Sequence, residues 1–191
     1  MNPRQWLATI DRRKIGRALL RWYDRHGRQL PWRRTKNPYH VLVSEIMLQQ
    51  TQVTTVLAYF PKFLELFPTL EQLAEAEESD VLHAWQGLGY YRRARNLKAA
   101  AEEIVHRHGG RFPEDPKRLA ELPGLGKYTA NAIACFAFEQ RQPILEANTV
   151  RVWTRVCAAE GDPAKAPLLR GTLWELAERP SQAGARTSIK P

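Results

Sequence analysis

Apolar residues recur at helical spacing along most of the chain. Between residues 12 and 26 this spacing places Ile15, Leu19 and Trp22 on one face, and Gly27 supplies a stop. Comparable patterns predict further helices at residues 39–50, 52–67, 80–86, 92–108, 128–138, 148–158 and 168–178. Because no segment alternates at period two, we expect an all-α fold with short connections.

Several turn and cap residues refine these boundaries. Pro61 should kink its helix or restart it, Thr69 resembles the first residue of a capping box, and Ser79 is placed to cap the helix that follows. Residues 27–38 hold two prolines and four cations without a period, which predicts an exposed basic loop.

One predicted helix, residues 39–50, is apolar on every side of a helical wheel and contains a single acid, Glu45. Burial disfavours the charged form of a carboxyl, so we expect a raised pKa for Glu45 and a proton ready for donation near neutral pH. The alternative is that Glu45 faces a rim or pairs with an arginine such as Arg33 or Arg151. The helix by itself does not separate these interpretations.

A second acid, Glu146, follows an apolar pair and precedes a predicted helix. Cleavage of a sugar–base bond through an oxocarbenium-like state needs two carboxyl groups in unlike environments, one protonated and one ionised. An acid at a helix N-terminus is also an ordinary placement that the helix dipole favours. Spacing does not decide between the two.

The segment LPGLG at residues 122–126 predicts a tight turn inside a helical hairpin that spans residues 117–138. Gly124 and Gly126 permit the turn, and its N–H groups, together with Lys127, converge where an anion such as phosphate would fit. The alternative is a plain helical hairpin without a ligand.

The charge balance of the chain favours the interpretation of this turn as an anion-binding site. Lys and Arg number 29 and Asp and Glu 20, so the formal net charge is +9, which points to nucleic acid as partner. No run of about 18 apolar residues exists to span a membrane. The two cysteines, Cys135 and Cys157, have neither disulfide nor zinc spacing, and no secretory signal is present, so we expect a cytoplasmic, nucleoid-associated protein.

Two further segments carry polar and aromatic residues suited to a base stack. Gln50 and Thr51 follow the apolar helix, while Leu88 and Tyr90 belong to the glycine-flanked sequence GLGYYRR. On this interpretation three neighbouring cations contact DNA phosphates: Arg92, Arg93 and Arg95. A polar helix end and a solvated basic face are the alternatives.

Taken together, the motifs resemble those of adenine DNA glycosylases of the MutY type, in the helix–hairpin–helix glycosylase superfamily. The resemblance covers roughly residues 15–178 and rests on PWR at 31–33, SEIMLQQTQV at 44–53, GLGYYRRARNL at 87–97 and LPGLGKYTANAI at 122–133. It implies a six-helix barrel domain at residues 31–145 and an incomplete second helical lobe, formed by residues 1–30 and 146–180.

The resemblance also implies an activity: removal of adenine mispaired with 8-oxoguanine or guanine in double-stranded DNA. Glu45 matches the acid that protonates adenine, and Glu146 stands where the family has an Asp that stabilises the sugar cation. Asn148 matches the Asn beside that acid. Tyr128 stands where related lyases carry a nucleophilic Lys, so we expect a monofunctional glycosylase. The alternative is a catalytically inactive DNA-binding remnant.

Further roles carry over position by position. Gln50 matches a wedge that fills the gap of the flipped base, and Tyr90 a ring inserted beside the oxidised guanine. Trp32 and Arg33 would shape the base pocket and its entrance. The hairpin would hold a monovalent cation at three carbonyls, those of Ala120, Leu122 and Leu125.

The end of the chain departs from the family pattern. Relatives continue into a four-cysteine loop for a 4Fe–4S cluster, and neither Cys135 nor Cys157 matches a ligand, so we expect a truncated chain that cannot build the cluster alone. Residues 181–191 predict a loose tail. A single-base frameshift in an ancestral Arg-Asp-Phe-Asn-Gln-Ala-Leu-Met segment would produce its last six residues, on codons that we assume. We expect a monomer that binds DNA and no membrane.

Overall fold

The computed structural model describes residues 11–156, 171, 173 and 174, and all regular structure within them is helical, as predicted. Contacts divide the chain into two compact units, one formed by Leu30–Arg141 and one by Met1–Gln29 together with Gln142–Ile189. The elements of the larger unit are η1 (Pro31–Arg33), α3 (Pro38–Leu48), α4 (Val53–Leu66), α5 (Leu70–Glu75), α6 (Glu78–Ala84), α7 (Arg92–His108), α8 (Pro116–Leu119) and α9 (Lys127–Phe136). Those of the smaller unit are α2 (Arg12–His26) and α10 (Ala147–Val156).

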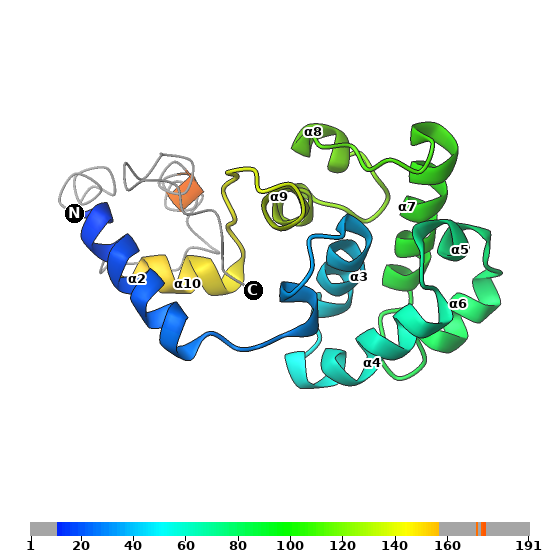
Figure 1. The fold of residues 1–191 in the computed structure, drawn as a ribbon, viewed down its shortest axis with the longest axis horizontal. Helices are drawn as coiled ribbons and strands as arrows, with labels where there is room; N and C mark the ends of the chain where they lie inside the picture. The colour runs from blue at the N-terminus through cyan, green and yellow to red at the C-terminus, as the bar shows by residue number, and fades with distance from the viewer. Residues whose placement is uncertain (1–10, 157–170, 172, 175–191) are drawn as a thin grey trace. The chain divides into compact units, whose positions relative to one another are not determined.

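Helix α3 is the centre of the larger unit. It packs against α4, α7, α9 and η1 (Figure 1), and eight of its 11 residues are buried. Leu42, Val43 and Met47 have no exposed surface. The prediction of a helix buried all round is confirmed.

The helix ends follow from local chemistry. The Asn37 side chain accepts from the Tyr39 N–H at 2.9 Å and starts α3, and the Thr69 hydroxyl accepts from the Gln72 N–H at 3.3 Å and starts α5. At the other end of α7, Gly109 adopts a left-handed conformation at φ 58°, which a residue without Cβ does at little cost.

Three local expectations need correction or refinement. Helix α6 begins at Glu78, with Glu77 preceding it, so Ser79 lies inside the helix and is not its cap. Residues 27–38 are not uniformly exposed, because Leu30 and Trp32 are buried in the core. The first turn of η1 brings Trp32 edge-on against Phe60, with the ring centroids 5.3 Å apart. Helix α4 continues through Pro61 without a restart.

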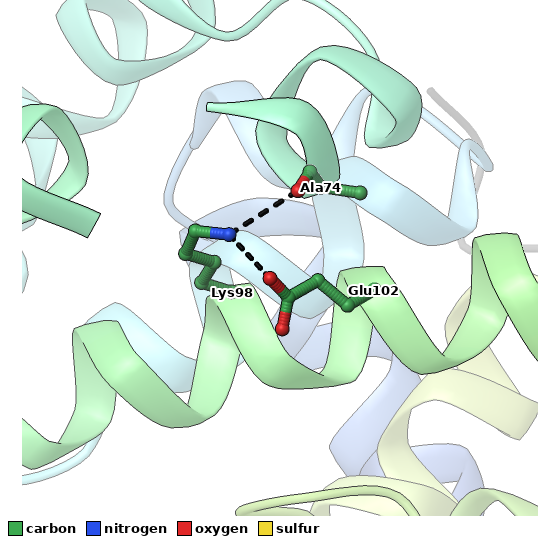
Figure 2. Close-up of polar contacts among 3 residues, drawn as sticks. All are labelled: Ala74, Lys98 and Glu102. Atoms are coloured by element: carbon green, nitrogen blue, oxygen red, sulfur yellow. Dashed lines mark hydrogen bonds and ion pairs between the residues drawn. The ribbon is translucent and has the colours of Figure 1, made fainter. Parts of the chain in front are cut away.

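A lysine joins α5 to α7. Figure 2 shows the Lys98 Nζ reaching from α7 to the Ala74 carbonyl in the last turn of α5, at 3.2 Å, and to the Glu102 carboxylate one turn further along α7. The last carbonyls of a helix have no partner within the helix, so this contact satisfies one of them and ties a six-residue helix to its neighbour.

In the smaller unit, the Asp11 side chain accepts from the Lys14 N–H at 2.9 Å and starts α2, which ends before Gly27 as predicted. Leu19 and Trp22 remain 58% and 56% exposed. Of the helix predicted at 168–178, residues 171, 173 and 174 are helical and the others lie outside the described residues, as does the predicted tail at 181–191. Among the described helices none is long and apolar enough to cross a membrane.

Candidate functional site

The predicted hairpin is present, with α8 packed against α9 and a glycine-containing turn between them. Gly124 has φ 75°, and a Cβ there would lie 2.6 Å from the Asn96 Cβ on α7. Both the backbone angle and the close approach therefore require glycine at this position. Leu122 and Leu125 are buried on either side and anchor the turn to the core.

The N-terminus of α9 is presented at the surface. Gly126 precedes the helix and supplies no side-chain cap, and both Gly126 and Lys127 are exposed. The first N–H groups of a helix carry partial positive charge and attract anions. Of the three carbonyls assigned to a cation, that of Leu122 accepts from the Leu125 N–H at 3.1 Å, while Ala120 ends α8 at the surface.

Glu45 lies in the middle of α3 and is 8% exposed. Its neighbours along the helix, Ser44 and Ile46, are each 1% exposed, and the Ser44 hydroxyl donates to the Val41 carbonyl at 2.9 Å. The burial of Glu45 excludes the exposed-rim interpretation. Burial of this kind is compatible both with a proton donor and with a carboxyl paired to an arginine.

Two turns of the larger unit present residues in an unusual backbone conformation. Gln50, between α3 and α4, has φ 56°, and Tyr90, just before α7, has φ 50°. Both side chains are exposed, that of Tyr90 by 63%. Residues with a Cβ rarely adopt positive φ, and such strain persists where surrounding contacts impose it, often at functional sites.

Arg93 lies between these two turns and is only 8% exposed. Its Nη1 is within hydrogen-bonding distance of the carbonyls of Ile46, Met47 and Gln49, at 3.1, 2.9 and 2.5 Å, and its Nη2 donates to the carbonyls of Leu88 and Gly89, at 3.0 and 3.1 Å. Burial lowers the pKa of Arg93.

The expectation that Arg93 meets phosphate is therefore wrong, because its guanidinium is committed to protein carbonyls. Arg95 pairs with Glu78 at 2.8 Å, and Arg92 is exposed. The sequence does contain an indication that Arg93 is buried. Arg93 lies on the same face of its helix as Leu97, Ala100 and Ile104, all of which are fully buried. The positive charge of Arg93 led to the prediction of an exposed side chain.

In the smaller unit, Glu146 caps α10. Its Oε1 accepts from the N–H groups of Asn148 and Thr149, at 2.9 and 3.3 Å. The Thr149 hydroxyl in turn accepts from the Glu146 N–H at 2.7 Å. This reciprocal arrangement is a capping box, so the helix-start placement foreseen for Glu146 is realised.

The remaining predicted site residues have distinct environments. Tyr128 is half-buried in the first turn of α9, and Thr51 is half-buried beside Arg93, whose Nη1 donates to its hydroxyl at 3.1 Å. Arg33 and Asn148 are exposed. Leu88 is 6% exposed, so its side chain belongs to the core in this structure and its contact with DNA stays a prediction.

The described residues do not fit an iron–sulfur cluster. No group of three or more His, Cys, Asp or Glu side chains within them could hold a metal. Cys135 is a half-buried thiol on α9, and Cys157 lies outside the described part of the chain.

An all-helical unit with a buried acid on its central helix, beside a hairpin that exposes an uncapped helix N-terminus, has the features of helix–hairpin–helix DNA-repair proteins. The family described as HhH-GPD superfamily base excision DNA repair protein matches residues 43–179. The chain belongs to this superfamily.

Relatives agree. The adenine DNA glycosylases of Rattus norvegicus and Homo sapiens are 42% and 43% identical over 172 and 171 residues, which is 85% of this chain in both cases and 33% and 31% of theirs. That of Mycobacterium tuberculosis is 46% identical over 145 residues, 75% of this chain and 48% of its own. The chain thus spans about a third to a half of these relatives.

Solved structures are similar as well. A thermostable thymine-DNA glycosylase has a TM-score of 0.77 at 31% identity, covering 90% of this chain and 79% of that one. A trapped endonuclease III–DNA covalent intermediate has a TM-score of 0.72 at 18% identity, over 88% of this chain and 78% of that one, which is a likeness of fold alone.

Proposed function

We propose that this chain is a monofunctional DNA glycosylase that removes adenine mispaired with 8-oxoguanine or guanine from double-stranded DNA. The observation that carries the proposal is a buried acid, Glu45, on the helix that ends at the turn of Gln50. The relatives named above as adenine DNA glycosylases support the choice of base.

Binding begins with charge. The formal net charge of +9 draws the protein to DNA, and the N-terminus of α9 with Lys127 takes a backbone phosphate. Carbonyls of the preceding turn, at Ala120, Leu122 and Leu125, hold a monovalent cation against the same phosphate. These contacts position the duplex without reading its sequence.

Base selection follows from the two strained turns. Gln50 fills the space that the flipped adenine leaves, and Tyr90 stacks beside the opposite 8-oxoguanine. Trp32 and Arg33 shape the pocket and entrance for the extruded base. An unstacked purine in a pocket of this kind is accessible to an acid that could not reach it inside the duplex.

In the chemical step, Glu45 donates its proton to a ring nitrogen of adenine. The glycosidic C–N bond breaks, its electron pair leaves with the base, and adenine departs neutral while the sugar carries an oxocarbenium charge. The Glu146 carboxylate, beside Asn148, stabilises that charge until water adds at the sugar carbon and loses a proton. Because Tyr128 offers a phenol and no amine, no Schiff base forms and the DNA strand stays intact.

The test is single-turnover adenine release from A:8-oxoguanine and A:T duplexes. We expect release from the first only, and we expect Glu45→Gln to slow it by about 10²–10⁴-fold, the usual contribution of a general acid. Glu65→Gln, which changes an exposed acid on α4, is the matched control and should act like wild type. Undiminished release by Glu45→Gln would overturn the assignment.

A second candidate is a DNA-binding protein without glycosylase activity. The observation in its favour is that Glu146, where the family has an Asp, already uses a carboxylate oxygen to cap α10. Salt-sensitive binding with no release of any base would select it. The duplex panel also includes T:G, since a thymine-DNA glycosylase is among the similar structures.

A further inference from the structure

The two strained turns share one structural partner. Arg93 Nη1 lies 2.5 Å from the Gln49 carbonyl, which belongs to the peptide bond that precedes Gln50. Arg93 Nη2 lies 3.1 Å from the Gly89 carbonyl, which belongs to the peptide bond that precedes Tyr90. One buried guanidinium therefore contacts the peptide plane immediately before each of Gln50 and Tyr90, two of the three described non-glycine residues with positive φ.

Aromatic packing fixes the guanidinium in turn. Its Cζ lies 5.5 Å from the ring centroids of both Trp85 and Tyr90, within the range of cation–π attraction. Trp85 has no exposed surface, and its Nε1 donates to the same Gly89 carbonyl at 3.1 Å. Within the described residues the Arg93 Nε is a buried nitrogen without a hydrogen-bond partner. Burying such a group is costly, and the five carbonyl contacts of the guanidinium offset that cost.

Arginine suits this position for a geometric reason. Its planar fork presents donors in fixed directions, whereas the ammonium of lysine is a compact charge on a flexible stem. A lysine at 93 could reach one turn but could not hold both peptide planes at once.

We propose that Arg93 is a positioning residue that sets Gln50 and Tyr90, as a pair, in the conformation that enters the base stack. The inference rests on the proposed function, because it assigns Arg93 to the base-flipping step of that activity. Arg93 itself touches neither the base nor the sugar. It acts through the backbone of the two turns.

The first test needs no substrate. Hydrogen exchange is measured on the free 191-residue chain as wild type, Arg93→Lys, Arg93→Met and Lys98→Met. Lys98→Met is the matched control, because it also removes a cation that caps a helix carbonyl. We expect about tenfold or faster exchange in both turns, at residues 49–52 and 89–92, for the Arg93 variants only. Unchanged exchange in both turns would overturn the proposal.

The second test separates positioning from general destabilisation. In single-turnover release, Arg93→Lys should lose about 10- to 100-fold, the scale expected of a small misplacement. In the background Gln50→Ala with Tyr90→Ala, the same change should cost less than about threefold, since the side chains it positions are gone. An equal loss in both backgrounds would show a merely structural role and overturn the proposal.

Failure of the proposed function has a different signature. If wild type releases no adenine, the same cycle is run with 2-aminopurine at the target base, whose fluorescence reports unstacking on binding. Arg93→Lys should then lower the unstacking signal in the wild-type background and leave it unchanged in the doubly substituted one. If wild type neither releases adenine nor unstacks the probe, this inference falls together with the proposed function.

Discussion

Glu146 has a structural role as the cap of α10 and a proposed role in chemistry, and substitutions can separate the two. Its carboxylate accepts from two N–H groups at the start of α10, and a negative charge at that point is favoured by the helix dipole. A carboxylate held in this way is oriented, which is what stabilisation of a sugar cation requires. Capping α10 and the proposed stabilisation of a sugar cation thus both require an oriented carboxylate at residue 146.

Substitution distinguishes the roles. Glu146→Asp keeps a good N-cap and retracts the carboxylate by one methylene, toward the residue found in the family. We expect adenine release to rise by about 10- to 100-fold. Glu146→Ser keeps a cap without a charge, so the unfolding free energy should stay within about 0.5 kcal/mol while release is lost. Single-turnover kinetics and urea unfolding measure both, and a Glu146→Ser variant that still releases adenine would contradict the role in chemistry.

At the scale of elements, the hairpin turn uses its two glycines differently. Gly124 is needed for folding, because of its positive φ and its approach to Asn96. Gly126 has φ −84° and nothing within 4 Å of a Cβ built on it, so folding leaves this position open to a side chain. What its lack of a side chain provides is an α9 N-terminus without a side-chain cap from residue 126.

Two substitutions follow from this difference. Gly124→Ala should lower the unfolding free energy by about 1–3 kcal/mol, the cost of a strained backbone position. Gly126→Ser should keep or slightly raise stability, since serine is a preferred N-cap, yet weaken DNA binding about tenfold because its hydroxyl competes for the phosphate's N–H groups. Thermal unfolding and anisotropy with a labelled duplex give the two readouts. Unweakened binding by Gly126→Ser would exclude a phosphate at this turn.

At the scale of the whole molecule, charge and fold act at different ranges. The net charge of +9 attracts any duplex, whereas only the cations that reach phosphates displace counterions. Arg93 is committed to buried carbonyls, whereas Lys36 and Arg95 form exposed ion pairs with Glu139 and Glu78. Lys127, exposed at the hairpin, is placed to contribute to binding.

The dependence of duplex affinity on salt tests this division. Over roughly 50 to 200 mM salt we expect log K to fall linearly with log salt concentration. Lys127→Gln should reduce the slope by about 1, as one phosphate contact is lost. Lys62→Gln, which removes an exposed cation on α4, should leave the slope unchanged. Equal effects of the two variants would mean that the hairpin makes no local contact.

The sequence by itself determined the helical class of the fold and several of its helix boundaries. A helix that is apolar on every side must be buried, so α3 and its position at the centre could be predicted from residues 39–50 alone. Gly109 after α7 and Thr69 before α5 mark boundaries that depend only on neighbouring backbone, and both are where the sequence places them. The pattern alone left the burial of Glu45 open, and the packing of α3 against its neighbours decided it.

Tertiary structure decided the features that depend on contacts between residues distant in sequence. Arg93 looks like a phosphate contact within its cationic helix, yet packing brings it to carbonyls more than 40 residues away, at Ile46, Met47 and Gln49. Positive φ at Gln50 and Tyr90 is likewise invisible in sequence, since neither residue type favours it. Local propensity acts over a few residues, whereas strain and the burial of a charge persist only where the packed fold supplies compensating contacts.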